Sequence, residues 1–393
     1  MFEPGIQYQC VVKTMAGFEN ILADELRSMG VQKVENGTRA VYFEGDLEDI
    51  YRVNYWSRFA LRVLISFHEY KAFDDKRLHS KAMQFEWEKL ISVDKTFAIN
   101  SAVSSDYHQH SHFASLRVKD AIADYFMEKY DERPSVDLDE PDVRIHLHIE
   151  KQFVTLSIDS SGESLHKRGY RTAHFEAPLN EVLAAGMIKL SGWTPDQPFW
   201  DPMCGSGTLI TEGLMMAKGI APQMKRERFG FMGWDSFDAE LFEKIKNEQH
   251  GESVKGEFYA SDLSSESIIA TYEHLSNLNL QEDVDCEAKD LMDAQPPSEK
   301  AGIAIINPPY GVRLEKDDVA QFYGEMGSHI KHNLKGWDVW IFTSNTDALK
   351  RFGLKPSKKI RLFNGALECR FHQYEIFAGR RSEHLSAKSG KEN

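Results

Sequence analysis

The second half of this 393-residue chain predicts an α/β domain with a doubly wound, mostly parallel sheet and an antiparallel terminal hairpin. Apolar strand-like segments alternate there with helical ones, which is typical of a parallel sheet covered on both faces. Near the end, Asn364-Gly365 separates two strand-like runs, 359–363 and 366–377. Asn-Gly between apolar runs is the strongest short hairpin signal. The first half predicts an α+β region without a nucleotide-binding loop.

The elements of the first half follow from hydrophobic periodicity. Apolar-polar alternation or short apolar runs predict strands at 7–13, 40–44, 62–69, 96–101, 143–149 and 153–158. Helical spacing predicts helices at 18–29, 47–56, 73–91 (with a break) and 113–130. The polar, basic stretch 159–172 is the expected boundary between the two halves.

In the second half, Pro178 can open a helix that Gly192 ends. The segments that follow predict strands at 198–200, 257–260, 284–288, 301–306 and 339–343 and helices at 209–218, 265–277 and 322–334. An insertion of about residues 219–255 interrupts this alternation. The chain beyond Gly379 is polar and charged, so we expect it to be disordered.

Composition indicates a soluble globular protein of two or three domains, with 41% hydrophobic and 27% charged residues. No apolar run approaches the roughly 20 residues of a membrane helix, and no signal peptide is visible. The four cysteines, Cys10, Cys204, Cys286 and Cys369, are far apart in sequence and form no CxxC pair. A disulfide framework or a zinc site is therefore not expected, and a reducing cytoplasm fits best.

The net charge of −14 argues against a protein that coats nucleic acid by charge alone. Basic residues nevertheless gather at three places. These clusters are His166-Lys167-Arg168 with Arg171, Lys225-Arg226 with Arg228, and 355–361. A single cluster is usually a solvated face, but three in an acidic chain indicate a localised polyanion site.

Asn307-Pro308-Pro309-Tyr310 directly follows the buried strand expected at 301–306. The carboxyl ends of such strands are where open α/β sheets bind ligands. Asn307 offers an amide oxygen, Pro308 leaves backbone carbonyls as acceptors, and Tyr310 offers a stacking face. Two acceptors on an exocyclic amine would favour a pyramidal nitrogen with a free lone pair. For an isolated Asn-Pro-Pro, a polar turn is an equally good interpretation.

Three earlier strand ends carry related signals. The DPMCGSGT turn, 201–208, has glycines that allow close ligand approach and lacks the Lys-Ser/Thr of a phosphate loop. Asp262 could bind ribose hydroxyls or cap the next helix. Asp290 could meet an adenine amine or be an exposed turn carboxylate. Each signal is ambiguous alone, but their order along successive strand ends favours a ligand site.

With its strand-end motifs in this order, the chain resembles the THUMP-domain RNA methyltransferases of bacteria, and in particular the 23S rRNA guanine-N2 methyltransferase module. The segments that carry the resemblance are 165–171, 177–185, 201–208, 307–314 and 364–377 for the class I methyltransferase part, and SVDKTFAIN, RVKDAIADYF and PDVRIHLHIEKQFVTLSID for THUMP. The resemblance implies a ferredoxin-like subdomain at 1–60, a THUMP domain at 61–160, the methyltransferase domain at 161–380 and a tail at 381–393. The long insertion belongs to the family pattern too.

The resemblance also implies S-adenosylmethionine as cofactor, S-adenosylhomocysteine as product, and no metal. The implied cofactor-binding residues are Asp201, Pro202, Cys204, Gly205, Ser206, Gly207, Thr208, Asp262, Leu263, Asp290, Asn307 and Asn180, with Glu181 as a further candidate. The implied catalytic residues are Asn307, Pro308, Pro309 and Tyr310. The N-terminal domains would grip folded RNA, expected to be 23S rRNA or a precursor of the large ribosomal subunit.

Two other functions stay open at this stage. Asn-Pro-Pro-Tyr also suits transfer to adenine N6 in RNA or DNA, because guanine and adenine both present exocyclic amines. A non-catalytic RNA-binding or ribosome assembly protein would be expected to have lost the cofactor loop, whereas Gly205, Gly207 and the Asn-Pro-Pro-Tyr motif are all present.

Overall fold

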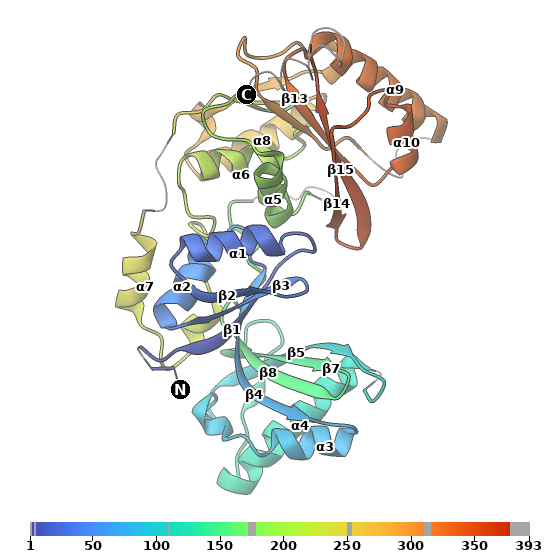
Figure 1. Cartoon of the computed structure of the whole chain (residues 1–393). Coiled ribbons are helices and arrows are strands. Elements are labelled where there is room, and N and C mark those ends of the chain that lie inside the picture. The colour runs from blue at the N-terminus through green and yellow to red at the C-terminus, as the bar shows by residue number, and fades with distance from the viewer. Residues whose placement is uncertain are drawn as a thin grey trace, which may run out of the picture. The chain divides into compact units, whose positions relative to one another are not determined.

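The computed structural model describes residues 2–3, 5–108, 110–171, 178–249, 254–309 and 316–377. The chain divides into two compact units (Figure 1). Unit 1 contains residues 1–167 and 226–248, and unit 2 contains residues 168–225 and 249–393. Tyr310 and the tail 381–393 lie outside the described residues.

Unit 1 is built on one eight-stranded sheet of order β2-β3-β1-β4-β8-β7-β5-β6. The strands are β1 (Tyr8–Lys13), β2 (Gln32–Asn36), β3 (Ala40–Gly45), β4 (Arg62–Lys71), β5 (Thr96–Ser104), β6 (Ser135–Val136), β7 (Val143–Glu150) and β8 (Phe153–Asp159). The helices are α1 (Glu19–Ser28), α2 (Leu47–Trp56), α3 (Asp75–Ala82), η1 (Trp87–Lys89) and α4 (Ser111–Tyr130). Strand β4 pairs with β1 on one side and β8 on the other, so the sheet runs without a break across the expected boundary at residues 60/61.

The insertion expected at 219–255 folds largely onto unit 1. Its 226–248 segment contains η2 (Gly230–Gly233) and α7 (Ala239–Lys246), and α7 packs on α2. The Trp56 indole N–H donates to the Ile245 carbonyl at 2.9 Å, and Arg52 pairs with Glu248 at 2.8 Å. This segment therefore belongs to unit 1, whereas the methyltransferase domain predicted from the sequence, 161–380, includes it.

Unit 2 contains a seven-stranded sheet of order β11-β10-β9-β12-β13-β15-β14. The strands are β9 (Phe199–Asp201), β10 (Phe258–Asp262), β11 (Asp285–Ala288), β12 (Ile303–Ile306), β13 (Asp338–Thr343), β14 (Lys358–Asn364) and β15 (Leu367–Glu375). The first five are parallel, and β15 runs antiparallel to both β13 and β14. The sequence-predicted mostly parallel sheet with a terminal hairpin is confirmed.

Helices cover both faces of this sheet, with α5, α6 and α8 on one side and α9 and α10 on the other (Figure 1). They are α5 (Glu181–Ser191), α6 (Thr208–Ala217), α8 (Ser265–Asn277), α9 (Lys316–Asn333) and α10 (Thr346–Arg351), with the 3-10 turns η3 (Gln281–Asp283) and η4 (Leu291–Asp293). Buried side chains of α9, including Tyr323, Met326 and Ile330, pack on Ile306 and Ile341 of the sheet. This packing holds α9 against β12 and β13 of the sheet.

The predicted elements differ from the structure in a few places. The sequence reading missed β2, β6, α7 and α10, which are short or carry few buried residues. Pro178 does not open α5, because Asn180 caps that helix by accepting from the N–H groups of Val182 and Leu183. Gly192 does end α5, with a left-handed φ of 79°.

Candidate functional site

A cavity of about 950 Å³ lies at the carboxyl edge of the unit 2 sheet. This volume is near the upper end of the roughly 300–1,000 Å³ range of ligand pockets. Its lining comes from the ends of β9, β10, β11 and β12 together with the start of α5 and from α9. The lining residues are Pro178, Leu179, Asp201, Pro202, Met203, Cys204, Gly205, Ser206, Thr208, Leu209, Asp262, Leu263, Ser264, Glu266, Ser267, Asp290, Leu291, Asn307, Pro309 and Phe322.

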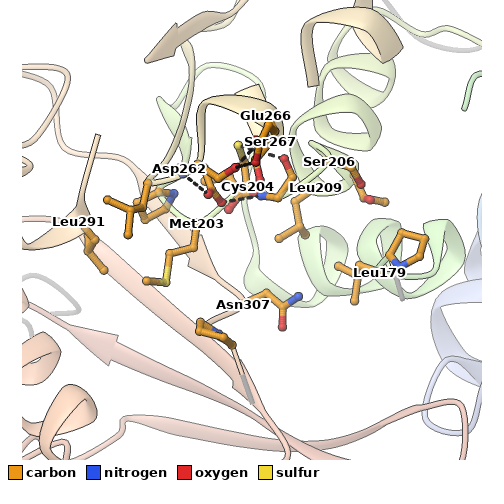
Figure 2. A pocket seen from close by; sticks show the side chains of 18 of the residues that line it. Leu179, Met203, Cys204, Ser206, Leu209, Asp262, Glu266, Ser267, Leu291 and Asn307 are labelled. Carbon is orange, nitrogen blue, oxygen red and sulfur yellow. Dashed lines mark hydrogen bonds between the residues drawn. The ribbon is translucent and has the colours of Figure 1, made fainter. Parts of the chain in front are cut away.

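The glycine turn after β9 forms one wall of the cavity (Figure 2). Gly205 has a φ of 52°, and a Cβ there would meet no atom within 4 Å, so its backbone is open to close approach by a ligand. Gly207 has a φ of 73°, and a Cβ there would lie 2.5 Å from Thr271 Cγ2. Gly205 therefore serves the cavity, whereas Gly207 lets the turn pack on α8.

Helix α8 holds the turn from behind. Thr271 Oγ1 donates to the Gly205 carbonyl at 3.0 Å, and His274 Nδ1 lies 2.9 Å from the Ser206 carbonyl. Burial lowers the pKa of His274, so its ring is neutral near pH 7 and donates from Nδ1. Both contacts use backbone carbonyls of the turn and leave the opposite side facing the cavity.

Arg171 also hydrogen-bonds to side chains of the glycine turn. Its guanidinium donates to Ser206 Oγ at 3.2 Å and Thr208 Oγ1 at 2.7 Å. The same group donates to the Leu179 carbonyl at 2.8 Å and to Glu181 Oε1 at 2.5 Å. Arg171 therefore ties the glycine turn to the start of α5, and both segments line the cavity.

Asp201 and Asp262 are two of the four acidic residues that line the cavity. Asp201 is 1% exposed, and its Oδ1 has no hydrogen-bond partner among the described groups. Burial raises the pKa of Asp201 well above its usual range, and the nearby Asp262 carboxylate raises it further. An unpaired buried carboxylate at a cavity wall is suited to receive a cationic ligand. The amino acid part of the predicted cofactor carries such a cation, so this site fits it.

The Asp262 carboxylate is partly engaged within the protein. Its Oδ2 accepts from the Gly205 N–H at 2.9 Å and its Oδ1 from the Ser264 N–H at 2.9 Å. The cap of α8 is Ser264, so the alternative role of Asp262 as helix cap is wrong. Each oxygen keeps a second lone pair for a ligand hydroxyl.

Asp290 does form a local cap. Its Oδ1 accepts from the Met292 N–H at 2.9 Å at the start of η4, while the residue lines the cavity.

Asn307 follows β12 and points into the space framed by Met203, Leu209 and Leu179 (Figure 2). Its Oδ1 is buried and has no hydrogen-bond partner among the described groups. A buried amide oxygen without a partner costs about 1–3 kcal/mol, so its retention at a cavity wall indicates a ligand donor. Burial raises the pKa of the Cys204 thiol, which also lines the cavity, so this thiol is protonated and no nucleophile.

Most residues of the predicted site line this one cavity. Those that do are Asp201, Pro202, Cys204, Gly205, Ser206, Thr208, Asp262, Leu263, Asp290, Asn307 and Pro309. Gly207 packs on Thr271, Asn180 caps α5, and neither is among the lining residues. Pro308 is buried and is also not among them, and Tyr310 lies outside the described residues.

Sequence reasoning missed the apolar part of the lining and the role of Arg171. Met203, Ser264 and Leu291 each directly follow or lie within a strand-end motif, so their positions next to these motifs could have indicated them. Leu179 comes from the segment before α5 and Phe322 from α9, and no spacing rule links them to the strand ends.

Four arginines of the first two basic clusters, predicted as part of a polyanion site, are engaged by groups of the protein itself. Arg168 is 1% exposed and pairs with buried Glu212, and Arg171 binds the glycine turn. Arg226 donates to five backbone carbonyls, those of Ser161, Glu163, Ser164, Lys167 and Arg228, and Arg228 pairs with Glu140 at 2.9 Å. These arginines stabilise the fold instead. In the third cluster, Lys355, Lys358, Lys359 and Arg361 are exposed on or beside the edge strand β14.

The strand order, the glycine turn after the first strand and the polar strand ends define a class I methyltransferase. A family model described as "RMKL-like, methyltransferase domain" matches residues 168–373. A THUMP domain matches residues 72–159, and an RlmL ferredoxin-like domain matches residues 9–64. The chain belongs to the family of RMKL-like methyltransferases, and the predicted family and fold class are confirmed.

Two curated relatives and two solved structures are informative. Ribosomal RNA large subunit methyltransferase K/L of Psychromonas ingrahamii is 39% identical over 93% of this chain and 50% of its own length. The Synechocystis protein slr0064, named as an RNA methyltransferase, is 36% identical over 92% of this chain and 95% of its own length. This chain thus spans about half the length of the K/L relatives that it matches.

Both structures cover nearly the whole chain. The methyltransferase SMU.472, complexed with SAH, has a TM-score of 0.83 and 29% identity and covers 95% of this chain and 99% of its own. A predicted N6-adenine-specific DNA methylase from Listeria monocytogenes has a TM-score of 0.82 and 30% identity and covers 94% and 97%. Within the described residues, no helix is long and apolar enough to cross a membrane, and no group of three metal-binding side chains occurs.

Proposed function

We propose that this protein transfers a methyl group from S-adenosylmethionine to the exocyclic N2 amine of a guanine in RNA, with ribosomal RNA of the large subunit as the substrate. The proposal rests most on one observation: Asn307 and Asp201 place two unpartnered buried oxygens at the wall of a single cavity. The amide oxygen of Asn307 suits an amine N–H, and the carboxylate oxygen of Asp201 suits an ammonium. S-adenosylmethionine supplies a methyl group already activated on a sulfonium.

The residues of the chain then have to bind and orient the reactants. Gly205 gives the cofactor close access to the backbone, and Asp262 offers its free lone pairs to ribose hydroxyls. Asn307 would accept from the target amine and hold its nitrogen in line with the methyl group. Proximity and orientation of this kind contribute up to roughly 7–11 kcal/mol to a bimolecular step. No described side chain in the cavity is required as a strong base.

The names of relatives support RNA as the substrate class, and the resemblance of the sequence to the guanine-N2 methyltransferase module supports guanine as the base. Slr0064 is named as an RNA methyltransferase, and this chain covers 95% of it. The K/L relatives are named for the large-subunit RNA. Exposed Lys359 and Arg361 on β14 could contact phosphates. The four cysteines are free, which fits a reducing compartment such as the cytoplasm.

Adenine N6 is the second candidate, because the Listeria structure carries that description and Asn307 can accept from either amine. The substrate class is tested by transfer of labelled methyl groups to ribosomal RNA from cells that lack the modification, with genomic DNA as the parallel acceptor. We expect label in RNA only. Incorporation into DNA and not RNA would contradict the proposal.

A further inference from the structure

Four exposed aromatic rings gather at one end of the unit 1 sheet. Phe73, Tyr107, Phe113 and Phe153 are 41%, 50%, 48% and 50% exposed. Soluble proteins seldom expose several large apolar side chains together unless the surface binds something. We call these four residues, with Lys71 and Arg77, the aromatic patch.

Three chain segments meet to form the aromatic patch. At the end of β4, the Ala72 N–H donates to the Gln152 carbonyl at 2.9 Å, which joins it to the β7–β8 turn. The Lys151 N–H donates to the Ser104 carbonyl at 2.8 Å, which joins that turn to the end of β5. The rings of Phe73 and Tyr107 then meet edge to face, with centroids 5.5 Å apart.

Cations lie over the faces of two rings. Lys71 Nζ is 4.9 Å from the centre of Phe153, and the Arg77 guanidinium carbon is 5.6 Å from that of Phe73. Beside the rings is a cavity of about 350 Å³. Its lining is Asp75, Tyr107, His108, His110, Phe113 and Ala114. Nδ1 of the buried His108 lies 3.0 Å from Asp75 Oδ1, and this contact joins the segment of Tyr107 to the start of α3.

We propose that the aromatic patch binds unpaired bases of the RNA substrate by stacking, an inference that rests on the proposed function. Aromatic rings interleaved with cations are the surfaces on which single-stranded nucleic acids stack. The cavity can admit a flat base, and the half-exposed Asp75 carboxylate can accept from a base amine.

The local charge favours stacking of bases over binding of the phosphate backbone at the aromatic patch. Four acidic residues accompany four basic residues in these segments. They are Asp74, Asp75, Asp106 and Glu150, and Lys71, Lys76, Arg77 and Lys151. With no local excess of positive charge, few counterions are released on binding here. The contribution of the aromatic patch to affinity should therefore depend little on salt.

The test uses fluorescence anisotropy with a fluorescein-labelled, 12-nucleotide single-stranded RNA and its duplex with a complementary strand. We expect Phe73→Ala and Tyr107→Ala each to weaken single-strand binding about 5- to 100-fold. The same fold-change should appear at low and high salt, with a smaller change for the duplex. Tyr107→Phe and Phe73→Trp keep a stacking face and should bind like the wild type.

Tyr130→Ala is the matched control. Tyr130 is 46% exposed at the end of α4 opposite to Phe113 of the aromatic patch, so this variant should bind RNA like the wild type. Unchanged single-strand affinity in the Phe73 and Tyr107 variants would overturn the inference, as would a loss equal for single strand and duplex or a loss confined to low salt. Altered self-association with unchanged RNA binding would assign the patch to a protein partner and also overturn it. The proposed function fails separately, if the wild type transfers no methyl group to RNA.

Discussion

Replacing Arg171 by alanine should weaken cofactor binding and destabilise unit 2, because one guanidinium joins two walls of the cavity. Arg171 is 18% exposed and its partner Glu181 6%. Removing one member of a buried ion pair costs about 3–5 kcal/mol, since the other charge is left unpaired. We take the lower end, about 3 kcal/mol, because Arg171 keeps some contact with solvent.

The effect on the cofactor comes from the contacts with Ser206 and Thr208. Hydrogen bonds to a charged donor contribute about 1.5–3 kcal/mol each. Only molecules in which the glycine turn is ordered are expected to bind the cofactor. If the variant orders this turn in a smaller fraction of molecules, the apparent affinity falls in proportion to that fraction. We expect the dissociation constant of S-adenosylhomocysteine to rise at least about tenfold, which corresponds to about 1.4 kcal/mol.

Isothermal titration calorimetry and thermal melting separate the two effects. Arg171→Lys keeps the charge but reaches fewer acceptors, so it should lie between wild type and alanine. The double variant Arg171→Ala/Glu181→Gln removes the unpaired charge and should regain much of the stability, but not the cofactor affinity. Arg361→Ala is the control, because Arg361 is 65% exposed. An Arg171→Ala protein that binds the cofactor like the wild type would refute this account of the turn.

Further predictions concern the glycine turn, the amide of Asn307, the buried carboxyl of Asp201 and the basic edge strand β14. Asn307→Ala should lower kcat at least 10²-fold, about 3 kcal/mol of barrier, with little change in cofactor dissociation constant by calorimetry; an unchanged kcat would exclude the amide from the reaction. Gly207→Ala should lower the free energy of unfolding, measured by thermal melting, by about 2 kcal/mol or more, because the φ of 73° and the contact with Thr271 both disfavour a Cβ at this position. Gly192→Ala should lower it less, because a Cβ there meets open space and only the left-handed φ disfavours it. Because the folded protein raises the pKa of Asp201, this carboxyl favours the fold most at low pH and loses that contribution as pH rises toward the raised value. Cofactor affinity should instead increase as pH rises through the raised value, where the carboxylate of the folded protein forms, and titrations at several pH values showing no such increase would rule out Asp201 as the cation acceptor. Lys359→Ala/Arg361→Ala should weaken RNA binding and flatten its salt dependence, and an unaltered slope of log affinity against log salt would remove β14 from the RNA surface.

The sequence could predict the sheet of unit 2 because its local signals agree with the fold. Apolar runs give β12 and β13, and Asn364-Gly365 gives the β14–β15 hairpin at the expected place. Parallel strands share a carboxyl edge, so Asp201, Asp262, Asp290 and Asn307 could be expected together before any contact was known.

Other features depend on contacts between segments that are distant in sequence. Nothing local shows that residues 226–248 leave the methyltransferase domain and pack on α2 of unit 1. Arg171 and Arg226 look like surface charges in the sequence, since burial of an arginine follows from acceptors that only the fold assembles. The capping of α5 by Asn180, which the resemblance assigns to the cofactor, likewise could not be anticipated from the sequence around it.

The central claim is that the ends of β9 to β12 position an exocyclic guanine amine before an activated methyl group. The most direct measurement is nucleoside mass spectrometry of unmodified large-subunit ribosomal RNA after reaction with the purified protein and isotope-labelled S-adenosylmethionine. We predict labelled N2-methylguanosine as the product. Labelled N6-methyladenosine as the sole product would contradict the choice of base, and label on a ribose oxygen or a ring carbon would contradict the amine site itself.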